Sequence, residues 1–224
     1  MSTRLAPALV ALLLAVTVAA PAGAARGPGE PRVLDSCDDA APWRALGSDD
    51  VAAAVVPVRG EHGGALRLEF DFHGHGGHAI ARRALPLELP ANFELSLRIR
   101  GVAAPNDLQL KLVDASGDNV WWHRRIAWQP TAAWQTLRIR RRAIEFAWGP
   151  TQDRTLESIA ALELAVVAGE GGRGYVEIDS LELRPLAPEP VPPPRPRARA
   201  SAGSTPEAAV DADATSAWRV RPGA

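Results

Sequence analysis

Short runs in which apolar and polar residues alternate are the feature that most constrains the fold of this chain. FELSLRIR (93–100) has an apolar residue at every second position, and GALRLEFDF (64–72) and DLQLKLV (107–113) follow the same pattern. Side chains alternate between the two faces of a β-strand, so each run predicts a strand with one buried face. Antiparallel sheets that cover one side of a core have this pattern.

Turn-forming residues separate these runs, as in Pro105-Asn106-Asp107 and Ser116-Gly117-Asp118. No long segment has helical periodicity. The chain therefore predicts an all-β fold, an antiparallel β-sandwich of jelly-roll type over 33–186. Near its end, Val176 and Ile178 share one face of a predicted strand, whereas Leu181 and Leu183 have the opposite parity. A β-bulge near Asp179-Ser180 would return both pairs to the core.

The two ends of the chain differ in composition from this region. Residues 1–24 contain Arg4, an apolar run and Ala22-Gly23-Ala24, which is the layout of a cleaved signal peptide and predicts a secreted or periplasmic protein. The apolar run is short for a spanning helix, which needs about 20 residues. Residues 187–200 are rich in proline and predict a stiff spacer.

Charge and cysteine content narrow the set of partners. The formal net charge is −1, which gives no reason to expect binding to nucleic acid or to an anionic membrane. Cys37 is the only cysteine, so an intramolecular disulfide is excluded. We expect this thiol to act as a small buried hydrophobe; a reactive thiol is the alternative.

Several segments, in order, carry a resemblance: LDSCDDAAPW (34–43), ARRALPLELP (81–90), LKLVDASGDNVWW (110–122) and IEFAWGP (144–150). Together they resemble a galactose-binding-like jelly roll, a group that is similar to non-catalytic carbohydrate-binding modules. Residues 201–224 resemble the opening of a discoidin, or coagulation-factor type C, domain. That piece is too short to bury a core and predicts a disordered tail.

Two adjacent tryptophans follow a turn in DASGDNVWWHRRIAW (114–128). Only one of them can face the core of a regular strand. Val120 makes one face the more apolar, so the sequence predicts Trp122 in the core and Trp121 on the open face. An exposed indole beside hydrogen-bonding groups suits a sugar ring. The candidate ligand-binding residues are Trp121, His123, Asn119, Arg125 and Trp148. The alternative is that these tryptophans fill the interior or cover its ends.

Acidic residues lie on the first and last predicted strands. The resemblance implies that these strands meet and that a structural Ca²⁺ sits between them. Carboxylates and the backbone carbonyls freed by a bulge are the oxygen ligands that calcium prefers. Asp38 and Asp179 are the predicted ligands, with Asp39 in reserve; ordinary surface carboxylates are the alternative.

Other polar clusters have simpler interpretations. The histidines of HGHGGH (73–78), His73, His75 and His78, lack the companion ligands of a transition-metal site and predict a glycine-rich hairpin loop. Basic residues on several predicted strands form either a positive surface that attracts acidic polysaccharide or a solvated face balanced by carboxylates. These residues are Arg98, Arg100, Lys111, Arg138, Arg140 and Arg142.

No nucleophile elbow, phosphate-binding loop or zinc-protease helix is present in the sequence. The leading hypothesis is therefore a secreted, non-catalytic module that binds a polysaccharide or glycan, as an accessory part of a larger polysaccharide-acting or adhesive protein. The alternative is a scaffold or protein-interaction sandwich that supports a downstream catalytic domain and binds no sugar. A hydrolase would require two carboxyl groups that face each other in a cleft.

Overall fold

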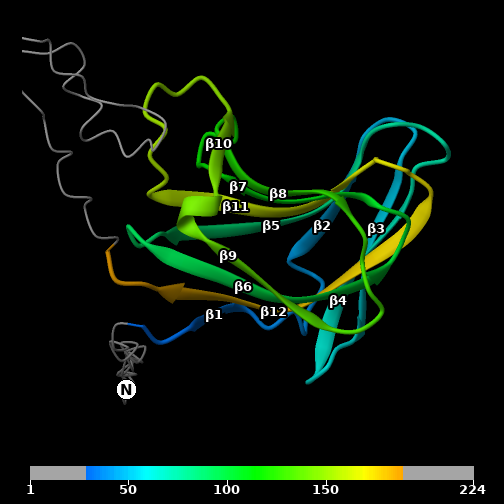
Figure 1. The fold of residues 1–224 in the computed structure, drawn as a ribbon, viewed down its shortest axis with the longest axis horizontal. Coiled ribbons are helices and arrows are strands. Elements are labelled where there is room, and N and C mark those ends of the chain that lie inside the picture. Colours follow the sequence, from blue (N-terminus) through cyan, green and yellow to red (C-terminus); the bar gives the residue numbers. More distant parts are fainter. Residues whose placement is uncertain (1–28, 189–224) are drawn as a thin grey trace, which may run out of the picture.

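A computed structural model describes residues 29–188, in which two antiparallel sheets pack face to face (Figure 1). This confirms the predicted all-β sandwich. The predictions for 1–24 and 201–224, and for most of the spacer 187–200, fall outside the described residues. In spatial order, the first sheet contains β3 (Ala52–Arg59), β4 (Gly64–Asp71), β12 (Arg173–Pro185), β6 (Phe93–Val102) and β9 (Gln135–Arg140), with β1 (Arg32–Asp35) beside β12. The second contains β10 (Glu145–Trp148), β8 (Val120–Trp128), β7 (Asn106–Val113), β11 (Ser158–Val167), β5 (His78–Glu88) and β2 (Trp43–Gly47).

Strand β6 shows why the alternation produces a sandwich. Its apolar residues from Phe93 to Ile99 are buried, whereas the polar residues that alternate with them are only partly covered. The apolar set of the first sheet meets that of the second to form one continuous core. A single 3₁₀ turn, η1 (Arg141–Ala143), connects β9 to β10. Within residues 29–188, no helix is long and apolar enough to cross a membrane.

Strand β12 contains the predicted bulge. Its pairing with β6 shifts register between Asp179 and Glu182, and Ser180 has a φ of 50°. Ile178 and Leu181 are consequently both buried, although their parities differ. The same edge of β12 pairs with β4 before the bulge and with β1 after it. In the β1 pairing, Arg32 lies opposite Leu183, so the start of β1 is beside the end of β12.

A polar group inside the sandwich fixes β1 to the second sheet. Asp35 accepts a hydrogen bond of 2.8 Å from Trp43 Nε1 and forms an ion pair with Arg83. Nearby, Cys37 is 1% exposed, and burial raises the pKa of its thiol to about 12. The thiol is therefore protonated at neutral pH, which agrees with a structural role and not with a reactive one.

The outer face of the first sheet is balanced in charge. Glu177 is 1% exposed and lies between Arg67 and Arg100, and Arg98 pairs with Glu61. Arg138 and Arg140 lie within 3.8 Å and 3.6 Å of Glu94. These arginines belong to a solvated, paired face. Lys111 does not join them, because β7 belongs to the second sheet.

Candidate functional site

The outer face of the second sheet has an unusual burial pattern. In the described part of the chain no further layer covers this face, yet β7 is buried at almost every position and β11 at most of them. The buried outward residues include Gln109, Lys111 and Glu163, each 7% exposed. Charged side chains are seldom buried to this extent unless they are paired. This outer face is therefore a candidate for a functional site.

The antiparallel register explains which side chains meet on this face. One row of directly opposed residues crosses all six strands from β2 to β10. We call this the charged row: Arg44, Arg82, Glu163, Lys111, Trp122 and Glu145. These residues come from six separate parts of the sequence and become neighbours only because of the strand order.

Glu163 is at the centre of the charged row. Arg82 Nη1 donates a hydrogen bond of 2.5 Å to Glu163 Oε1, and Lys111 Nζ lies 3.9 Å from Glu163 Oε2. Burial lowers the pKa of Lys111, while the carboxylate of Glu163 acts in the opposite direction. His78 lies close enough for the Lys111 charge to add to the effect of burial, and both lower the pKa of the imidazole. Its neutral form is therefore favoured at neutral pH.

Two indoles form the aromatic part of the site. Trp122 and Trp148 meet edge to face with ring centroids 5.4 Å apart, and Trp148 is 45% exposed. The guanidinium of Arg124 lies over the Trp122 ring at 4.4 Å, and Lys111 Nζ lies 5.5 Å from the centroid of the Trp148 ring. We call Trp122 and Trp148 the aromatic pair. Apolar ring surface and hydrogen-bond donors are thus adjacent at one place.

A small apolar cluster lies outside the main core, and its member Val120 stands opposite Trp148 in the pairing of β8 with β10. Val113, Val120 and Ala161 pack together on the outer face, with Ala147 against them. Their burial fixes the orientation of β8, since Val120 must face outward to join them. Trp122 then faces outward as well, and Trp121 faces the core.

The predicted orientation of the two tryptophans is therefore wrong. Trp121 is 5% exposed, packs edge to face on Phe146 at 5.4 Å and donates a hydrogen bond of 2.9 Å to the carbonyl of Arg154. Val120 marks the outward side of β8 and not the core-facing side, because it belongs to the outer cluster. The open-face indole on β8 is Trp122.

The other predicted ligand-binding residues separate into different environments. Trp148 lies on the outer face, as part of the aromatic pair. Asn119 is 8% exposed and structural: its Nδ2 donates to Asp114 at 2.7 Å, and its Oδ1 accepts from Thr151 N at 3.0 Å. These bonds fix the segment that follows Trp148.

His123 and Arg125 share the strand parity of Trp121 and not that of Trp122. Nδ1 of His123 lies 3.0 Å from the carbonyl of Ala143, the last residue of η1, and it carries the hydrogen because a carbonyl only accepts. Arg125 is exposed and stands opposite the core residue Leu108. Neither is placed with the aromatic pair, so their assignment to one site with Trp148 is wrong.

Sequence reasoning missed Arg82, Gln109 and Glu163 as site residues. A signal for one of them, Glu163, is present in ALELAVV (161–167), where it interrupts a run that is otherwise apolar. Strands that are apolar on both faces around a single charge are typical of a covered face with a buried polar group.

The predicted calcium ligands lie around one turn of the first sheet. Oδ1 of Asp38 accepts from Gly64 N at 2.7 Å, and Oδ2 of Asp179 accepts from Glu61 N at 3.3 Å. Asp39 accepts from Ala41 N instead. Within residues 29–188 there is no group of three or more His, Cys, Asp or Glu side chains that could hold a metal ion. Calcium binding stays a prediction, now limited to Asp38 and Asp179 with backbone oxygens.

Chelation tests the calcium prediction directly. An ion bound only by the folded state stabilises it, so EDTA is expected to lower the melting temperature of the purified protein and excess calcium to restore it. Differential scanning calorimetry of the wild type and of Asp38→Asn measures the effect. A melting temperature unchanged by complete metal removal contradicts the prediction.

Comparisons with known proteins identify the fold. The sequence matches no protein-family model and no curated protein sequence. Among solved structures, it is similar to a family 11 carbohydrate-binding module from Clostridium thermocellum in complex with a β-1,3-1,4-mixed-linked tetrasaccharide. The TM-score is 0.59 at 16% identity, over 71% of this chain and 98% of that one. The family 11 module of the C. thermocellum cellulosomal cellulase Lic26A-Cel5E gives a TM-score of 0.56 at 16% identity, over 70% and 95% of the two chains. The described domain has the galactose-binding-like jelly-roll fold, as the sequence resemblance implied.

Proposed function

We propose that this domain binds carbohydrate on the outer face of its second sheet and catalyses no reaction there. The observation that carries the proposal is Trp148, which is 45% exposed beside Trp122 on a face with buried polar side chains. A family 11 module with this fold has been solved with a bound tetrasaccharide, which supports the same class of ligand. We further propose export and an accessory role in a larger protein, on the sequence features of residues 1–24 and 187–224.

An indole complements the C–H face of a sugar ring, and hydrogen-bonding groups complement the hydroxyls at its edge. The C–H face of a pyranose packs on an aromatic plane, and excluding water from that contact supplies affinity. Hydroxyl groups at the ring edge need donors and acceptors. Lys111 provides a donor beside Trp148, and Glu163 and Arg82 follow it along the charged row. Because these side chains are already fixed by their mutual contacts, little conformational freedom is lost on binding.

The exposure of Trp148 favours sugar binding over the scaffold alternative. A domain that only supports a neighbour would bury Trp121 and Trp148 alike by packing, whereas Trp121 is buried and Trp148 is not. The hydrolase alternative is not supported by the buried carboxylate of this face. Glu163 faces Arg82 and Lys111 and not a second carboxylate. Glycosidase chemistry requires two carboxyl groups across the scissile bond.

A binding panel tests the proposal on the wild-type protein. In affinity electrophoresis, at least one soluble polysaccharide in the gel is expected to slow the migration of the protein. Saturation with that polymer is expected to raise the melting temperature, because the ligand binds only the folded state. A folded protein that migrates freely through a broad panel of neutral and acidic polymers would favour the scaffold alternative.

A further inference from the structure

The charged row carries more positive than negative charge. It contains the cations Arg44, Arg82 and Lys111 and the carboxylates Glu163 and Glu145, and Arg124 adds a further cation next to Trp122. The two sheets differ in this respect. On the first sheet, the arginines of β6 and β9 face carboxylates of neighbouring strands.

Lys111 is the cation whose surroundings require explanation. It is 7% exposed, and its Nζ lies 3.9 Å from Oε2 of the Glu163 carboxylate. That carboxylate also accepts a hydrogen bond of 2.5 Å from Arg82. One negative charge thus serves two buried or half-buried cations, which leaves a positive excess in a poorly hydrated place.

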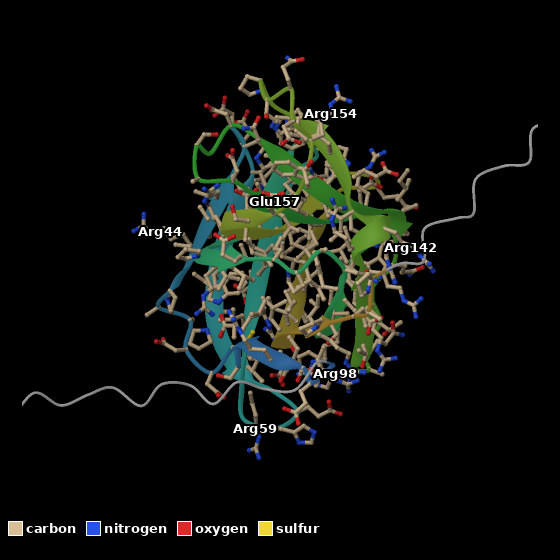
Figure 2. The ribbon with its side chains drawn as sticks, turned by 90° about the vertical axis from the view of Figure 1, so that its left-hand side faces the viewer. Arg44, Arg59, Arg98, Arg142, Arg154 and Glu157 are labelled. Carbon is tan, nitrogen blue, oxygen red and sulfur yellow. The ribbon has the colours of Figure 1, made fainter. Side chains whose placement is uncertain are left out.

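The cation is adjacent to the aromatic surface. Nζ of Lys111 lies 5.5 Å from the centroid of the Trp148 ring. At the far end of the charged row, Arg44 projects outward from β2 at the periphery of the molecule (Figure 2). Positive groups therefore lie on β7, β5 and β2, and Glu163 of β11 stands between Lys111 and Arg82.

We infer that the glycan bound on this face is acidic and contains uronic acid. This inference rests on the proposed function and narrows its ligand class. In a uronic acid, the carboxylate is joined directly to the sugar ring, so a ring packed at Trp148 presents its charge close to the ring edge, where Lys111 lies. The guanidinium groups of Arg82 and Arg44 match further carboxylates along the polymer, since a planar guanidinium pairs with a carboxylate through two parallel hydrogen bonds.

Chemical reduction of the carboxyl groups to alcohols tests the effect of polymer charge alone. Polygalacturonate, alginate and polyglucuronate are each compared with their carboxyl-reduced forms, which keep the linkages and lose the charge. Titration calorimetry on the full chain is expected to give roughly tenfold or tighter binding of one acidic polymer relative to its reduced form at low salt. This preference is expected to shrink as salt is added.

Matched variants assign the preference to the charged row. Lys111→Gln is expected to bring the affinity for the acidic polymer close to that for the reduced form. Arg138→Gln, on the outer face of the first sheet, removes the same charge and is expected to leave the preference unchanged. If Lys111→Gln does not fold, the exposed Arg44→Gln serves in its place with a smaller expected loss.

The outcomes show whether the uronic-acid inference fails alone or together with the proposed carbohydrate binding. Equal affinity for acidic and reduced polymers overturns the uronic-acid inference and leaves carbohydrate binding intact. Binding of sulfated but not of uronate polymers also overturns it. No binding to any polymer, acidic, neutral or sulfated, overturns the proposed function together with the inference.

Discussion

Replacing Trp148 with alanine is expected to weaken glycan binding at least about tenfold while leaving the fold intact. An aromatic anchor at the centre of a binding site typically contributes about 1–3 kcal/mol or more, and a tenfold loss corresponds to about 1.4 kcal/mol. The side chain is 45% exposed and its ring contacts Trp122 and Lys111, so its removal opens no cavity in the core. Calorimetric titration with the polymer identified by the binding panel measures the loss.

Trp134 provides the matched control for this variant. It directly precedes β9 of the first sheet in the sequence and is half-buried, and the guanidinium of Arg100 lies 4.5 Å from the centroid of its ring. Trp134→Ala is expected to retain wild-type affinity, whereas Trp122→Ala is expected to lose affinity as Trp148→Ala does. Retention of full affinity by both Trp122→Ala and Trp148→Ala would place the sugar site elsewhere.

Replacing Trp121 with alanine is expected to reduce the free energy of unfolding by about 3–5 kcal/mol, as is usual for a large aromatic residue in a core. The variant loses the packing against Phe146 and leaves the Arg154 carbonyl without its indole donor. For a domain of ordinary stability, about 5–15 kcal/mol, this is a large fraction. Urea denaturation followed by tryptophan fluorescence measures the change.

The same variant also tests the assignment of the two indoles. Where Trp121→Ala is still folded, at low temperature and without denaturant, its affinity for the glycan is expected to stay near that of the wild type. Trp148→Ala should show the reverse, with lost binding and a nearly unchanged unfolding midpoint. A Trp121→Ala protein that is fully stable and fails to bind would contradict the structure of β8.

Local patterns in the sequence were enough to predict the sandwich. The alternation in β6 fixes which side chains enter the core, and the change of parity between Ile178 and Leu181 correctly indicated the bulge. In each case the burial of one residue follows from its immediate neighbours along the chain, because the period of a strand is a local property.

The candidate site depends on contacts between distant segments and was predicted only in part. The orientation of β8 is set by Val113 and Ala161, which contribute to the outer cluster from two other strands. Glu163 and Arg82 meet because β11 lies between β7 and β5, an order that no short segment encodes. Trp148, predicted as a ligand-binding residue, is exposed on the outer face, and its role in binding stays a prediction.

The position of β1 beside β12 affects how the domain responds to tension. Arg32 and Leu183 lie opposite each other in an antiparallel pair, so the chain enters and leaves the described domain at the same edge. Force applied through these two points would separate β1 from β12 one hydrogen-bonded pair at a time, as in unzipping, and would not load all of the bonds together in shear. The outer face of the second sheet lies on the other layer, so the first step of such peeling would leave the charged row in place.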